Sequence, residues 1–143
     1  MIPNPGAAQS DSYMLQQISS ATPEQLCVML LEGAQRFLTQ AIASVKAHNI
    51  SEKAKYVNRV SAIVEELMVQ VVSDDGNELA KNLSRIYEWW MNQLFEASRG
   101  DDTQKMEMIY SQMDDMRLTW VQLIHKTPQA PSAASSLSGD LMG

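Results

Sequence analysis

The stretch TPEQLCVMLLEGAQRFLTQAIASV, residues 22–45, decides the fold because it starts with helix-capping residues and continues with apolar side chains at helical spacing. Thr22 is a favourable N-cap, Pro23 suits the first helical position, and Gln25 completes a capping box. The apolar side chains that follow cover about half of the helix circumference, which is more than a contact with one neighbouring helix needs. We therefore expect a helix to about residue 47 that touches two neighbours or keeps part of its apolar surface for a partner.

Three further stretches, 52–73, 77–98 and 102–126, repeat apolar residues in steps of three and four, which predicts three more helices. Short polar breaks separate them, with Ser51 expected to cap the second helix, Gly100 to lie near the end of the third, and Asp101 or Asp102 to cap the fourth. The repeats are Val57, Val60, Val64, Leu67 and Val71; Leu79, Leu83, Ile86, Trp90, Leu94 and Ala97; and Met106, Ile109, Met113, Met116, Trp120 and Leu123. Seams of this kind with short connections predict an all-α fold, an antiparallel four-helix bundle over residues 22–126.

The two ends of the chain differ from this middle part. Residues 1–21 and 127–143 are rich in Pro, Ser, Ala and Gly and poor in large apolar side chains. Such segments bury too little surface to offset the entropy of ordering them. We expect a flexible N-terminal arm over 1–21 and a disordered tail over 127–143.

Charge and composition exclude several classes of protein. The net charge of −6 makes nucleic acid and anionic membranes poor partners, and the longest apolar run, LCVMLL, is far too short to span a bilayer. The start of the chain lacks the basic and apolar regions of a secretory signal, and the single cysteine, Cys27, suits a reducing compartment. We therefore expect a cytoplasmic protein in which Cys27 is a small apolar filler.

Residues that carry chemistry are few. No phosphate-binding loop, nucleophile elbow or dinucleotide fingerprint is present, and two histidines and one cysteine make no plausible metal site. We expect no enzyme activity, no metal and no cofactor. The alternative is a small helical enzyme of the chorismate mutase type, which would need inward-facing arginines. Arg36, Arg59 and Arg85 fall away from the seams, whereas Arg117 falls at a seam edge and could point inward.

The wide apolar surface leaves two interpretations open: a core shared with two neighbouring helices, or a groove for an amphipathic partner helix. On the first helix we expect Leu30 and Phe37 to be structural and the partner groove to lie beside them. Trp90 lies on a seam and should be core, whereas its neighbour Trp89 is either a cover for the bundle edge or an exposed anchor. The residues predicted to contact a partner are Tyr13, Ile18, Leu31, Leu38, Ile42, Ile63, Met68 and Trp89.

Tyr13 and Ile18 belong to an apolar cluster, with Met14 and Leu15, in an otherwise small and polar lead-in. A loose tail has no use for such a cluster. We expect this arm either to shield the groove while it is empty or to contact the partner directly.

The order of these motifs resembles the flagellar secretion chaperone FliS family over about residues 13–124. The resemblance rests on TPEQL at 22–26 followed by a Met- and Leu-rich run and Gly33–Ala34, on GNELAKNLSRIYEWWMNQL from Gly76, and on Trp120 within MRLTWVQLI. Tyr13 corresponds to the family's N-terminal tyrosine. The chain departs from the family pattern at Leu31 and Glu32, where an aromatic residue and Asp are frequent.

What the resemblance implies is a cytoplasmic chaperone that binds the C-terminal segment of newly made flagellin. Such a chaperone prevents premature polymerisation and helps to deliver flagellin to the flagellar type III export apparatus. The implied partners are therefore flagellin and components of that apparatus, with no catalytic residues.

Overall fold

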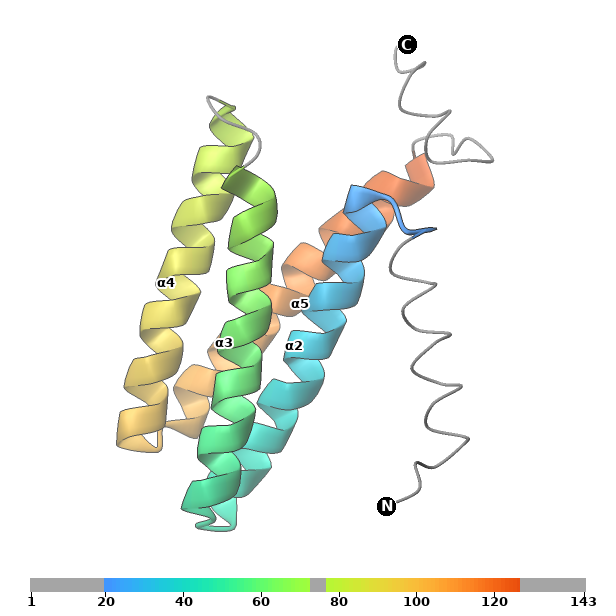
Figure 1. Ribbon diagram of the computed structural model, residues 1–143. Coiled ribbons are helices and arrows are strands. Elements are labelled where there is room, and N and C mark those ends of the chain that lie inside the picture. Colours follow the sequence, from blue (N-terminus) through green and yellow to red (C-terminus); the bar gives the residue numbers. More distant parts are fainter. Residues whose placement is uncertain (1–19, 73–76, 127–143) are drawn as a thin grey trace, which may run out of the picture.

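The computed structural model describes residues 20–72 and 77–126, apart from the side chain of Val72. The described residues form helices α2 (Pro23–Lys46), α3 (Ile50–Val72), α4 (Glu78–Gly100) and α5 (Thr103–Lys126) and contain no strand. Successive helices run antiparallel, α2 and α4 each pack against both α3 and α5, and the contact between α4 and α5 is the smallest of the four (Figure 1). The predicted all-α four-helix bundle is confirmed, while the expectations for the two tails concern residues outside the described part.

The helix ends are set by local hydrogen bonds. The Thr22 hydroxyl accepts from the Gln25 N–H at 3.1 Å and the Gln25 side chain accepts from the Thr22 N–H at 3.0 Å, as the capping box predicts. The prediction that Ser51 caps α3 is wrong. Asn49 rather than Ser51 takes this position, since its side-chain oxygen accepts from the Glu52 N–H at 3.0 Å.

The turn from α4 to α5 depends on a residue other than glycine in the left-handed region. Gly100 is the last residue of α4, and Asp101 takes φ 50° after it. Lys53 of α3 stabilises this end, because its ammonium group donates to the Ser98 carbonyl at 2.8 Å and to the Asp101 carboxylate at 2.7 Å. The Asp102 carboxylate then accepts from the Lys105 N–H at 3.0 Å, which identifies Asp102 as the cap of α5.

The core contains most of the predicted seam residues. On α2, however, Leu31 and Leu38 are 0% exposed, while Leu30 and Phe37 are only partly buried. The prediction that Leu31 and Leu38 lie nearer a partner groove than Leu30 and Phe37 is therefore wrong. The spacing of apolar residues along α2 gives the width of its apolar stripe. The centre of the stripe depends on where α3 and α5 lie, which the spacing does not give. The core residues are Leu31, Ala34, Leu38, Ala41, Val57, Val60, Val64, Leu67, Tyr87, Trp90, Leu94, Ala97, Met106, Ile109 and Met113.

Candidate partner-binding surface

Helices α4 and α5 leave a short turn and run antiparallel, so residues equally far from the turn lie opposite each other. Two hydrogen bonds fix this register. The Trp90 indole N–H donates to the Gln112 side-chain oxygen at 2.8 Å, and the Tyr87 hydroxyl donates to the Met116 sulfur at 3.8 Å. One turn further on, the same register places Leu83 level with Trp120.

The register predicts one more apolar pair, Leu79 level with Leu123, but the structure leaves this pair open. Leu79 is 56% exposed and Leu123 is 46% exposed, although both belong to apolar repeats that predict a buried seam. Figure 1 shows the reason, since the first turns of α4 and the last turns of α5 diverge away from the 101–102 turn. The seam assignment is therefore wrong at this end of the bundle.

At these diverging ends Leu79 and Leu123 lack the helix neighbour that their spacing predicts, Ile86 is also exposed, and Leu83, Met116 and Trp120 beside them are only partly buried against the core. We call this surface the open face. It comprises Leu79, Leu83 and Ile86 of α4 and Met116, Trp120 and Leu123 of α5.

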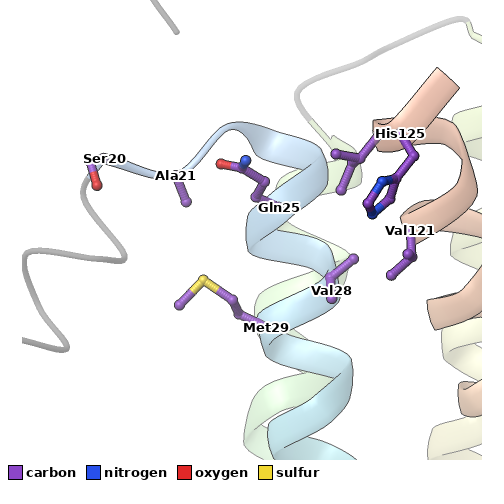
Figure 2. Close-up of a pocket in the computed structure, with 8 residues that line it drawn as sticks. Ser20, Ala21, Gln25, Val28, Met29, Val121 and His125 are labelled. Carbon is purple, nitrogen blue, oxygen red and sulfur yellow. The ribbon is translucent and has the colours of Figure 1, made fainter. Parts of the chain in front are cut away.

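A hollow of about 410 Å³ lies on the other side of the end of α5, against the start of α2. In Figure 2, Val28 on α2 and Val121 and His125 on α5 lie across this hollow from one another. Val121 and Ile124 directly follow Trp120 and Leu123 in the chain, so apolar side chains continue around the end of α5. The lining residues are Ser20, Ala21, Gln25, Val28, Met29, Val121, Ile124 and His125.

The titratable groups buried near this end hold their protons at neutral pH. Burial, followed by the carboxylate of Glu24, raises the pKa of the Cys27 thiol to about 11. Its sulfur lies 3.5 Å from the Gln70 side-chain oxygen. Burial, with a smaller contribution from Cys27, raises the pKa of the Tyr87 hydroxyl as well. This end of the bundle therefore offers neutral apolar contact rather than an activated nucleophile.

The structure does not gather the predicted partner-binding residues onto one surface. Leu31 and Leu38 are core, and Ile42 is partly buried against that core. Ile63 fits against the backbone of α2, since its Cδ1 lies 3.3 Å from the point that a Cβ on Gly33 would occupy. These four residues serve contacts between helices.

The remaining predicted residues are Met68, Trp89, Tyr13 and Ile18. Met68 is partly buried against the core, whereas Trp89 is 40% exposed, so its role as an exposed anchor stays a prediction. Trp89 follows Ile86 by three residues, so the two side chains are neighbours on the surface of α4. Tyr13 and Ile18 lie outside the described residues.

Arg117, the one arginine considered as an inward-facing ligand, lies in an ionic contact between α5 and α2. Its Nη2 is 2.8 Å from the Asp114 carboxylate and its Nη1 is 4.0 Å from that of Glu32. The Gln35 amide also donates to Asp114 at 3.0 Å. Hydrogen bonds from Gln35 and then Arg117 lower the pKa of the Asp114 carboxyl, and the bond to Asp114 raises that of Arg117.

No catalytic constellation appears in the part of the chain that the structure covers. The described lining of the hollow contains no arginine or lysine that could hold a dicarboxylate. Within residues 20–72 and 77–126, no group of three or more His, Cys, Asp or Glu side chains could hold a metal ion. None of the described helices is long and apolar enough to cross a membrane.

Comparison with known proteins identifies a family. The sequence model of the flagellar protein FliS matches residues 6–127. The flagellar secretion chaperone FliS of Vibrio cholerae is 28% identical over 107 residues, which cover 75% of this chain and 79% of that protein. FliSB of Pseudomonas aeruginosa is 29% identical over 109 residues, 76% of this chain and 86% of that protein. FliS of Bacillus subtilis is 24% identical over 113 residues, which cover 79% of this chain and 84% of that protein.

Proposed function

This chain belongs to the flagellar protein FliS family, and on that premise we propose that it binds the C-terminal segment of flagellin on the open face. The relatives named above are flagellar secretion chaperones. In this proposal the chain covers the flagellin segment, prevents it from polymerising too early, and helps to deliver it to the export apparatus. The chain acts by binding and release rather than by turnover of a small molecule.

The observation that carries the proposal is that Leu79 and Leu123, which the register predicts to pack on each other, are both left about half exposed. An amphipathic client helix with apolar side chains three and four residues apart can occupy the place of the missing helix neighbour. A disordered client segment gains this contact while it folds, and the bundle needs little change.

The energy of such contacts indicates how much of the client must bind. Completing the burial of a half-exposed leucine is worth on the order of 1 kcal/mol, so Leu79, Ile86 and Leu123 supply about 3 kcal/mol before any ordering cost, and Leu83, Met116 and Trp120, which already pack against the core, add less. A micromolar complex needs about 8 kcal/mol net of that cost. The client must therefore extend past the open face, and the hollow lined by Val28, Val121 and Ile124 is the adjoining apolar surface.

We place this function in the cytoplasm. The chain carries a net charge of −6 and a single cysteine, a composition that suits a reducing compartment where flagellin is held before export. The same negative charge disfavours adsorption to nucleic acid and to anionic lipid.

Co-expression with flagellin tests the proposal. Tagged chain should retain full-length flagellin through purification and should lose it when the C-terminal segment of flagellin is deleted. Equal retention of both forms would move the binding segment elsewhere in flagellin, and retention of neither would remove flagellin as the client. Measurable chorismate rearrangement by the purified chain, lost in Arg117→Ala, would favour the enzyme alternative.

A further inference from the structure

The outer face of α2 and α3 carries a cluster of aromatic and cationic side chains that the open face does not include. The rings of Phe37 and Tyr56 stack with their centroids 6.1 Å apart. The Arg59 guanidinium lies 5.4 Å from the Phe37 centroid and 5.9 Å from the Tyr56 centroid, and the Lys55 ammonium lies 4.9 Å from Tyr56. With Arg36 these residues form what we call the cationic face.

Arg36 belongs to the cluster because of the register between the two helices. Arg36 and Arg59 lie at nearly equal distances along the chain from the turn at 47–49, so antiparallel α2 and α3 bring them to the same level. The Nη2 of Arg36 lies 3.7 Å from the point that a Cβ on Gly33 would occupy, so this side chain folds along α2. Gly33 is also where Ile63 of α3 meets α2.

The positive charges of this face lack carboxylate partners. Lys46, Lys53, Lys105 and Arg117 each form an ion pair. Among the residues that the structure describes, no carboxylate oxygen comes within ion-pair distance of Arg36, Lys55 or Arg59. Other described cations, such as Arg85 and Arg99, also lack an ion pair, so what distinguishes this face is that Lys55 and Arg59 gather at one pair of rings in a chain with a net charge of −6.

Stacking prepares Arg59 for a particular kind of ligand. A guanidinium that lies over aromatic rings uses its flat face there and keeps its N–H edge for hydrogen bonds. That edge matches the two oxygens of a carboxylate, and the rings restrict the rotamers that binding would otherwise have to order.

Acidic residues limit the length of the ligand. Glu52 and Glu66 lie seven residues before and after Arg59, so they share its side of α3 at a distance of about 10 Å in each direction. A long polyanion such as nucleic acid would meet these carboxylates, whereas a short acidic segment fits between them.

We propose that the cationic face docks a short acidic segment of a second protein. Carboxylates of that segment bind Arg59 and Arg36, and an apolar side chain packs on the Phe37–Tyr56 pair. By the bounds of α2 and α3, the site lies between the middle of these helices and the 47–49 turn, whereas the diverging ends in Figure 1 are at the opposite end of the bundle, so the site stays accessible while the open face holds a client. The proposal does not depend on which client that is.

Fluorescence anisotropy with a short dye-labelled peptide tests this docking site. The peptide carries two glutamates on either side of a leucine, and a matched peptide carries glutamines instead. The full chain should bind the glutamate peptide about tenfold more tightly, and Arg59→Gln should remove most of that difference. Arg36→Gln, which disturbs no ring contact, should weaken binding in the same direction.

Arg85→Gln is the control, because Arg85 is an exposed cation on α4 whose side chain bonds only to Asn82 at 2.9 Å among the described residues. It should leave peptide affinity unchanged, and Arg59→Gln should leave flagellin-peptide affinity unchanged. Equal binding of both peptides, or an equal loss in Arg85→Gln, would overturn the proposal. So would a single-stranded oligonucleotide or an anionic vesicle that binds as tightly with the same dependence on Arg59.

Discussion

Replacing Leu31 by alanine removes a side chain that lies wholly inside the bundle at 0% exposed. Deleting the part of the side chain beyond Cβ loses about 2.4 kcal/mol of transfer free energy at about 0.8 kcal/mol per methylene. The cavity left behind raises the cost, so we expect a loss of about 3 kcal/mol in the free energy of unfolding. For a bundle of this size, that lowers the melting temperature by about 12 °C.

Leu30→Ala is the matched control, because it makes the same chemical change at the adjacent, partly buried position. The residue keeps part of its surface in water, so we expect about half the loss, on the order of 1.5 kcal/mol. Urea unfolding of the full chain, monitored by circular dichroism, measures both values. The comparison holds if the dependence of the unfolding free energy on urea concentration is the same in both variants. An equal or larger loss for Leu30→Ala would refute the assignment of the core side of α2.

Three further predictions follow from single contacts. Because burial raises the pKa of the Cys27 thiol from 9.0 to about 11, iodoacetamide should label the folded chain roughly 100-fold more slowly at mildly alkaline pH than the chain unfolded in urea; equal rates would contradict this. The pKa of the Asp114 carboxyl, lowered chiefly by the Gln35 hydrogen bond, lies below its ordinary 3.8, so its stabilisation is present above pH 3.8 and lost as the pH falls through the folded value. Asp114→Asn should therefore lower the melting temperature at pH 7 and have no effect at the acid end of a pH series; a loss that does not vary with pH would contradict this. Lys53→Met should cost about 1 kcal/mol in thermal unfolding because Lys53 bonds to the end of α4, whereas Lys55→Met should stay within about 0.5 kcal/mol.

The helices could be predicted from the sequence because their signals are local. The capping box at Thr22 and Gln25 fixes the start of α2 through atoms three residues apart, and no distant contact is needed. The error at the start of α3 has the same local character. Both Asn49 and Ser51 are good cap residues, and the left-handed turn at His48, with φ 57°, selects the earlier one.

The open face could not be predicted because it depends on the angle between two helices. The apolar repeat of α5 continues without a change through Trp120 to Leu123. The same repeat would be present whether α4 packed against this end of α5 or diverged from it. One signal was available, since Val121 and Ile124 widen the apolar surface beyond a single stripe at the end of α5. That width pointed to a further contact there, although not to its partner.

The cationic face shows the same limit. The sequence places Arg36 and Arg59 away from the apolar seams, which is typical of solvated side chains. Their position beside Phe37 and Tyr56 arises from the register of α2 against α3, which a pattern within one helix does not encode.

The most direct test of the account compares two leucines on α5 that differ only in the direction they face. Leu123 on the open face is 46% exposed and Leu118, about 140° away around the helix, is 44% exposed. Both are replaced by aspartate, and calorimetry measures the affinity of each variant for a peptide from the C-terminal segment of flagellin. A client on the open face should lose more than about tenfold in affinity for Leu123→Asp and less than about twofold for Leu118→Asp, because only the first change puts a charge into the apolar contact. Equal affinities in the two variants would contradict binding on the open face.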